Sequence, residues 1–139
     1  MASRSIDVLG SVPLFEGLSK KELAQVSRLG KVVETPAGAV LVEEGSHGVG
    51  FHVILDGTAK VTVGGRKRAT LKAKDFFGEL SLLDRGPRTA TVSAETPLRT
   101  LWLDSHDFLA LVDRNPSIAR KLLVEVATRL RGLERSHTH

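Results

Sequence analysis

Two charged residues nine positions apart, Glu79 and Arg88, have the types and spacing to bind a ligand together. The stretch GELSLL begins with Gly78 and continues into residues of good helix propensity, which predicts a short helix starting there. The free amides at the start of a helix attract an anion, and a guanidinium such as that of Arg88 holds two of its oxygens. The carboxylate of Glu79 would repel a bare phosphate at contact distance. The predicted ligand is therefore a phosphate-like anion that also carries hydroxyl donors.

The same two residues also allow an enzymatic interpretation, with Glu79 as a base and Arg88 as an electrostatic clamp. The sequence supplies no metal-ligand set, nucleophile or second acid beside them, so we expect no enzyme. The glycines of GSHGVG lack the Lys-Ser or Lys-Thr of a nucleotide-triphosphate loop, and they read as a turn. His47, His52 and His106 show no paired ligand spacing, so neither a metal site nor a cofactor is expected.

The composition of the chain favours one soluble domain. With 139 residues and 41% hydrophobic content, we expect a single domain over 1–139, with its core over about 12–134 and a disordered tail over 135–139. The sequence has no cysteine, no signal peptide and no long apolar run, so a cytoplasmic location without membrane insertion is expected. The net charge is +4, but GGRKRAT is the one dense basic run, and it reads as a solvated hairpin end rather than a nucleic-acid contact.

The N-terminal part of the chain predicts a helix, and the middle part predicts strands. Ser19 and Glu22 form a capping box, followed at helical spacing by Leu23, Val26 and Leu29. From Lys31 the apolar period changes to two, with turn signals between the runs.

The strongest hairpin signal is Asp56-Gly57. It predicts that the face made by Phe51, Val53 and Leu55 lies across a turn from Ala59, Val61 and Val63. Gly64-Gly65 marks a further turn. The fold class expected is mainly β with flanking helices, a jelly-roll-like barrel of six to eight strands with an N-terminal helix and two C-terminal helices.

The two C-terminal helices meet at Asn115-Pro116, where Asn can cap the first helix and Pro can open the second. The second helix carries an apolar stripe typical of a face turned to the core. The stripe consists of Ile118, Leu122, Val126, Leu130 and Leu133.

The pattern F-G-E-L-S-L-L-x-x-x-P-R-T-A-T-V, residues 77–92, closely resembles the phosphate-binding cassette of cyclic-nucleotide-binding domains. These domains occur in catabolite-activator-type regulators, regulatory subunits of cyclic-nucleotide-dependent kinases, and gated channels. The resemblance extends over about 12–133, through PLFEGLSKKEL, LVEEG and FHVILDGTAKVTV. It implies a non-enzymatic sensor of cyclic AMP or cyclic GMP that signals through its C-terminal helix to a fused or separate effector. No recognition helix follows the sensor, so direct DNA binding is not expected. The alternative is a ligand-free structural or partner-binding module of the same fold.

The resemblance also implies roles for single residues. Arg88 would bind the cyclic phosphate, and Glu79 would accept a hydrogen bond from the ribose 2′-hydroxyl. Gly78 would allow close approach of the ligand. The backbone amides that would line the cassette are those of Leu80, Ser81, Thr89 and Ala90.

The base and the sugar would contact apolar side chains. Val42, Val61 and Leu71 fall where the family places such side chains, although each also fits a plain core position. Leu133 would close over the base together with Leu130. The Thr89 hydroxyl would favour guanine modestly, so both nucleotides are expected to bind, with cyclic AMP as the physiological ligand.

Overall fold

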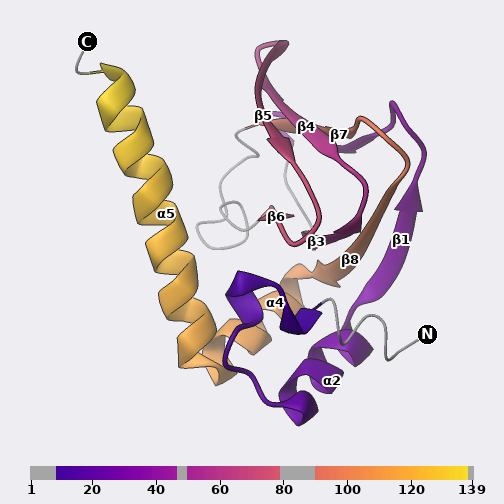
Figure 1. Ribbon diagram of the computed structural model, residues 1–139, viewed down its shortest axis with the longest axis vertical. Helices are drawn as coiled ribbons and strands as arrows, with labels where there is room; N and C mark the ends of the chain where they lie inside the picture. The colour runs from indigo at the N-terminus through magenta and orange to yellow at the C-terminus, as the bar shows by residue number, and fades with distance from the viewer. Residues whose placement is uncertain (1–8, 47–49, 79–89, 138–139) are drawn as a thin grey trace.

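The computed structural model describes residues 9–46, 50–78 and 90–137 (Figure 1). The elements in chain order are η1 (Pro13–Phe15), α2 (Lys20–Leu29), β1 (Lys31–Thr35), β2 (Val40–Val42), β3 (Gly50–Asp56), β4 (Ala59–Val63), β5 (Arg66–Leu71), β6 (Phe76–Phe77), β7 (Thr91–Ala94), β8 (Leu98–Asp104), α4 (Ser105–Arg114) and α5 (Pro116–His137). Helix α5 thus includes residues 135–137, over which the sequence predicts a disordered tail.

The strands form two four-stranded antiparallel sheets. Their orders are β1-β8-β3-β6 and β2-β7-β4-β5. This arrangement confirms the mainly β, jelly-roll-like fold with flanking helices. Within the described residues the two sheets stay separate rather than closing into one barrel.

Strand β3 faces two apolar clusters because its side chains alternate between the two sides of the sheet. Phe51, Val53 and Leu55 point to the helices, and Ile54 points to the space between the sheets. The helical-side cluster consists of Leu9, Val12, Leu14, Phe15, Leu23, Val26, Phe51, Val53, Leu55, Leu101, Leu103, Phe108, Leu111, Ile118 and Leu122. The inter-sheet cluster consists of Val42, Ile54, Ala59, Phe77, Val92, Ala94 and Leu98.

The hairpin predicted at Asp56-Gly57 is wrong, because β3 and β4 belong to different sheets. Asp56 still pairs with Arg99 of β8, and the chain then crosses to the second sheet. The Thr58 amide donates to Thr96 Oγ1 at 2.9 Å, and the Thr58 carbonyl accepts from the Glu95 amide at 3.0 Å. These bonds hold the crossing against the β7–β8 connection. The turn at Gly64-Gly65 does join β4 to β5 as a hairpin.

Helix α2 begins as the sequence predicts. The Ser19 amide donates to Glu22 Oε1 at 2.9 Å, and the Glu22 amide donates to Ser19 Oγ at 3.1 Å. Leu23 and Val26 are buried, but Leu29 is 38% exposed because it is the last residue of the helix, where the chain turns into β1.

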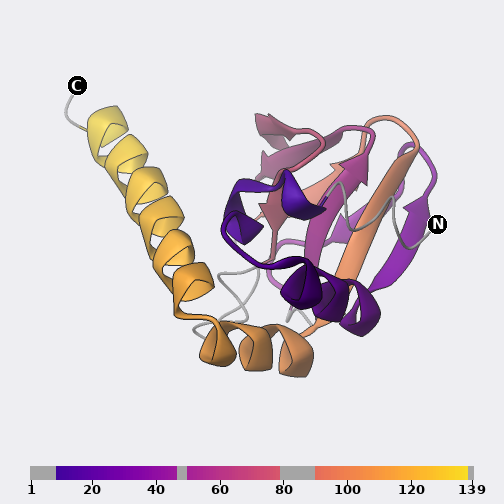
Figure 2. The same cartoon turned by 60° about the horizontal axis from the view of Figure 1, so that its bottom comes forward.

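The two C-terminal helices divide at the predicted place, with Asn115 ending α4 and Pro116 opening α5. In α4, Phe108 stacks on Phe51 of β3 with ring centroids 4.4 Å apart. Figure 2 shows α5 running from the end of α4 away from the sheets. Among the residues described, no helix is both long and apolar enough to cross a membrane.

Only the first part of the predicted α5 stripe has described side chains. Ile118 and Leu122 are buried against the helical-side cluster, while Leu123 and Val124 are 70% and 60% exposed. The side chains of Val126, Leu130 and Leu133 lie outside the described part of the structure.

Candidate functional site

The predicted cassette is described at its two ends. Gly78 follows β6 directly and has φ +100°, a conformation that favours glycine because it has no Cβ. Ala90 is half-buried and directly precedes β7. The predicted site residues Glu79, Leu80, Ser81, Arg88 and Thr89 lie outside the described residues. The structure therefore fixes where the cassette leaves one sheet and where it enters the other.

The entry into β7 is tied to two neighbouring segments by side-chain hydrogen bonds. The Glu44 amide, after β2, donates to Thr91 Oγ1 at 3.0 Å. The Gly64 amide, in the β4–β5 turn, donates to Glu44 Oε1 at 3.0 Å. Since Thr91 follows Ala90 directly, these bonds hold the end of the cassette against β2 and the hairpin.

The three apolar residues predicted near the sugar and base share the inner face of the second sheet. Val42 and Val61 both pair with Val92 of β7, so the three valines form one row across the sheet. Leu71 lies in the adjacent row, opposite Ala59. Val42 is 8% exposed, and Val61 and Leu71 are partly buried against the inter-sheet cluster. This face can serve as an apolar floor for a ligand, and it also contributes to the core.

The dense basic run lies on the exposed strand β5. Lys67 Nζ is 3.0 Å from Glu95 Oε2, and the two side chains are 50% and 30% exposed. Ion pairs with this exposure contribute little to stability. The position agrees with the solvated hairpin end expected from the sequence.

Beside the start of the cassette lies a buried polar residue that the sequence pattern does not assign to the predicted site. His52 lies within β3, is 8% exposed, and stacks on Phe77, the residue before Gly78. The signal that could have identified it is a histidine at an inward position of the otherwise apolar run GFHVIL.

A small group of potential metal ligands lies at the start of α4. Ligand atoms of Asp104, His106 and Asp107 are within 4.8 Å of one another. Asp104 Oδ1 accepts from the Asp107 amide at 2.8 Å, which is ordinary helix capping, and the His106 side chain is 91% exposed. The capping of α4 accounts for this group, and we assign no metal to it.

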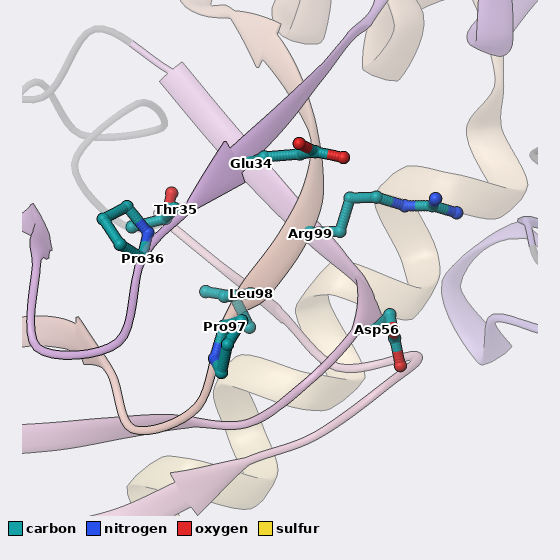
Figure 3. Close-up of a pocket in the computed structure, with 7 residues that line it drawn as sticks. All are labelled: Glu34, Thr35, Pro36, Asp56, Pro97, Leu98 and Arg99. Atoms are coloured by element: carbon teal, nitrogen blue, oxygen red, sulfur yellow. The ribbon is translucent and has the colours of Figure 1, made fainter.

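A pocket of about 510 Å³ is lined by described residues other than those predicted for the site (Figure 3). Its lining comes from β1, β3, β8 and their adjoining turns, and consists of Glu34, Thr35, Pro36, Asp56, Pro97, Leu98 and Arg99. Arg99 pairs in register with Glu34 on one side and with Asp56 on the other, and its buried Nε has no hydrogen-bond partner. Because two carboxylates flank the single guanidinium, this pocket is poorly suited to a phosphate.

Comparison with known proteins shows which family and which proteins this chain resembles. The family model described as "Cyclic nucleotide-binding domain" matches residues 32–115. A cyclic nucleotide-gated potassium channel of Mesorhizobium japonicum is 35% identical over 116 residues, which cover 84% of this chain and 32% of the channel.

Two solved structures share the fold. The structure titled cAMP-bound PfPKA-R has a TM-score of 0.88 and 27% identity, covering 96% of this chain and 46% of that one. The catabolite activator protein of Thermus thermophilus has a TM-score of 0.80 and 32% identity, covering 89% of this chain and 61% of that one. The chain spans 29 to 33% of the length of the bacterial potassium channels that it matches. With the family model matching well over half of its residues, the chain belongs to the cyclic nucleotide-binding domain family.

Proposed function

We propose that this chain binds cyclic AMP or cyclic GMP without chemical turnover and acts as a regulatory sensor. The observation that carries the proposal is the family match over residues 32–115, which contains the whole segment from Gly78 to Ala90 together with Glu79 and Arg88. The structural relative titled as cAMP-bound supports the same ligand class. The relatives reported above are channels and regulatory proteins, which favours sensing over catalysis.

The cassette residues take complementary roles in this proposal. Arg88 neutralises the cyclic phosphate through charge-assisted hydrogen bonds, and Glu79 accepts from the ribose 2′-hydroxyl. The amides of Leu80, Ser81, Thr89 and Ala90 line the phosphate site, and Gly78 lets the backbone approach it. The positive φ of Gly78 supports its part in this turn, because a residue with a Cβ would be strained there.

The sugar and base lie against the inner face of the second sheet in this proposal. Val42, Val61 and Leu71 form its apolar floor, and the burial of these residues beside one another supports that use. Leu133 of α5 covers the base. Both nucleotides bind, with cyclic AMP as the physiological ligand, because the one hydroxyl of Thr89 contributes only about 1 kcal/mol of discrimination.

In this proposal, the C-terminal helices transmit nucleotide binding to an effector. Binding tightens the turn after Gly78 and repacks α5, whose first part already contacts the helical-side cluster through Ile118 and Leu122. The effector is fused to this domain or is a separate protein. We further propose a cytoplasmic location, one domain over residues 1–139, no metal, and no direct contact of this chain with DNA or membrane.

Isothermal titration with cyclic AMP and with cyclic GMP tests the function. Saturable heats, with the nucleotide recovered unchanged by chromatography, are the expected result. Recovery of a hydrolysed nucleotide would instead indicate that the chain is an enzyme, with Glu79 as the base and Arg88 as the electrostatic clamp. If neither nucleotide produces heat or a shift in melting temperature, the chain is a ligand-free module of the same fold and the proposal is wrong.

A further inference from the structure

The strand that leads into the cassette is very short. β6 consists of Phe76 and Phe77 alone, and it pairs with β3 through His52 and Val53. Gly78 follows at once, and the cassette begins there. Backbone hydrogen bonds of 2.9 Å between Ile54 and residues 74–75 extend the pairing with β3 before β6. At the cassette end, β6 stops at Phe77, so the side-chain contacts of Phe77 contribute to the position at which the cassette begins.

The side chain of Phe77 is held by an imidazole. The rings of His52 and Phe77 stack with centroids 4.7 Å apart and planes 8° apart. Both residues are buried, at 8% and 6% exposure. Phe76 points to the other side of the sheet, where its ring lies 5.6 Å from that of Phe51. The two aromatic residues of β6 are therefore anchored on opposite faces.

The imidazole is itself held in place by a second buried polar residue. His52 Nδ1 is 3.1 Å from the hydroxyl of Thr100, which is fully buried on β8. Thr100 pairs with Ile54 in the long β3–β8 ladder at the middle of the sheet. Because this hydrogen bond fixes the plane of the imidazole, it also fixes the surface on which Phe77 stacks.

A histidine would lower the stability of the fold at a position that only fills space, because burying a polar group is unfavourable unless it has a hydrogen-bond partner. Valine, isoleucine or phenylalanine would fill an inward position of β3 without that requirement. What the His52–Thr100 pair adds over an apolar side chain is a defined orientation for a flat ring. That orientation is useful where the neighbouring residue opens a ligand-binding segment.

We propose that His52 is a positioning residue for the cassette. It links the rigid β3–β8 ladder, through Phe77, to the start of the cassette at Gly78, and so reduces the ordering that nucleotide binding must produce. The inference rests on the proposed function for its effect on affinity. The link between His52 and β6 itself does not depend on any ligand.

The test uses three variants that separate the ring stacking from the hydrogen bond. His52→Leu removes both. His52→Gln keeps an amide for Thr100 and loses the ring, and it also serves as the informative variant where His52→Leu does not fold. The pair His52→Phe with Thr100→Val keeps a flat ring on Phe77 and leaves no buried hydroxyl without its imidazole.

A matched control reports general loss of stability. Val26→Ala removes two methyl groups from a fully buried position of α2, in the helical-side cluster. It destabilises the domain without touching His52, Phe77 or the cassette ends. The measurements are the Kd of cyclic AMP by titration calorimetry, the melting temperature, and amide exchange at Phe77 and Gly78 without ligand.

Two results are expected from the variants. His52→Leu and His52→Gln weaken cyclic AMP binding at least fivefold and speed exchange at Phe77 and Gly78. The double variant keeps a ring but loses the hydrogen bond that orients it, so it weakens binding less than these two, by about two- to fivefold. Val26→Ala binds within twofold of the parent despite its lower melting temperature. The proposal is overturned if His52→Leu and His52→Gln bind within twofold, or if Val26→Ala weakens binding as much as they do.

The calorimetric titration of the parent protein tests the proposed function separately. If the parent binds neither nucleotide, the proposed function fails, and amide exchange still decides whether His52 holds β6. Unchanged exchange at Phe77 and Gly78 in the His52 variants would overturn that link as well.

Discussion

Gly57, at the crossing between the two sheets, should be among the positions least tolerant of a methyl group. Its φ is +93°, and an added Cβ would lie 2.3 Å from the Pro97 carbonyl oxygen and 3.1 Å from Leu98 Cα. Gly17 has the same φ of +93°, with no atom within 4 Å of an added Cβ. The pair Gly57→Ala and Gly17→Ala therefore separates backbone strain from collision.

The expected magnitudes follow from these two terms. Backbone strain at positive φ costs about 1 to 2 kcal/mol in both variants. Collision with backbone atoms adds about 1 to 3 kcal/mol for Gly57→Ala, because those atoms cannot rotate away. They are also held in place, since the amides of Glu95 and Thr96, directly before Pro97, both donate to the Thr58 carbonyl. The stiffening of the unfolded chain by alanine is common to both variants and cancels in their difference.

Urea unfolding followed by circular dichroism measures the difference. Gly57→Ala should lower the free energy of unfolding by about 2 to 5 kcal/mol, against about 1 to 2 kcal/mol for Gly17→Ala, with unchanged denaturant slopes. Melting temperatures should fall by roughly 3 °C for each kcal/mol. Equal losses in the two variants would refute the reasoning, because they would mean that the Pro97 carbonyl moves aside at no cost.

Four further outcomes concern the ligand. Arg88→Leu should weaken cyclic AMP binding by about 2 to 4 kcal/mol, roughly 30- to 900-fold in Kd, and an affinity within threefold of the parent would contradict the cassette assignment. Glu79→Ala should abolish a preference of the parent for the ribose 2′-hydroxyl over the 2′-deoxy analogue, measured by competition, whereas an undiminished preference would place the hydroxyl contact elsewhere. Thr89→Ala should lower cyclic GMP affinity several-fold and leave cyclic AMP nearly unchanged, and equal losses would show that Thr89 serves the phosphate or the fold. Saturating cyclic AMP should slow amide exchange over residues 118–135, and unchanged exchange there would contradict the closing of α5.

Local signals predicted the local structure well. The capping box of Ser19 and Glu22 needs only neighbouring residues, and both of its hydrogen bonds are present. Pro116 opens α5 because proline at the first position of a helix gives up no intrahelical hydrogen bond. The alternation in β3 also identified the face formed by Phe51, Val53 and Leu55.

Signals that depend on distant partners were less reliable. Asp56-Gly57 has the composition of a hairpin turn, but β3 pairs with β8, whose residues are far along the chain. Side-chain packing across the whole sheet decides which strand pairs with β3. A two-residue turn signal carries no information about that packing. His52 was missed as a site residue for the same reason, since its contacts with Phe77 and Thr100 exist only after β6 and β8 have joined β3.

The pairing of early strands with late ones sets a time at which the domain can become functional during its synthesis. Residues 31–35 pair with residues 98–102, and β2 pairs with β7, so the first strands leave the ribosome long before their partners. Folds built on such distant pairings form slowly, because a long loop must close before any contact stabilises it. A nascent chain that ends just past Ala90 already contains the whole cassette, but β1 and β3 still lack the strand that lies between them. Nucleotide should therefore be unable to stabilise the growing chain until β8 has emerged, and the domain becomes competent to bind late in its own translation.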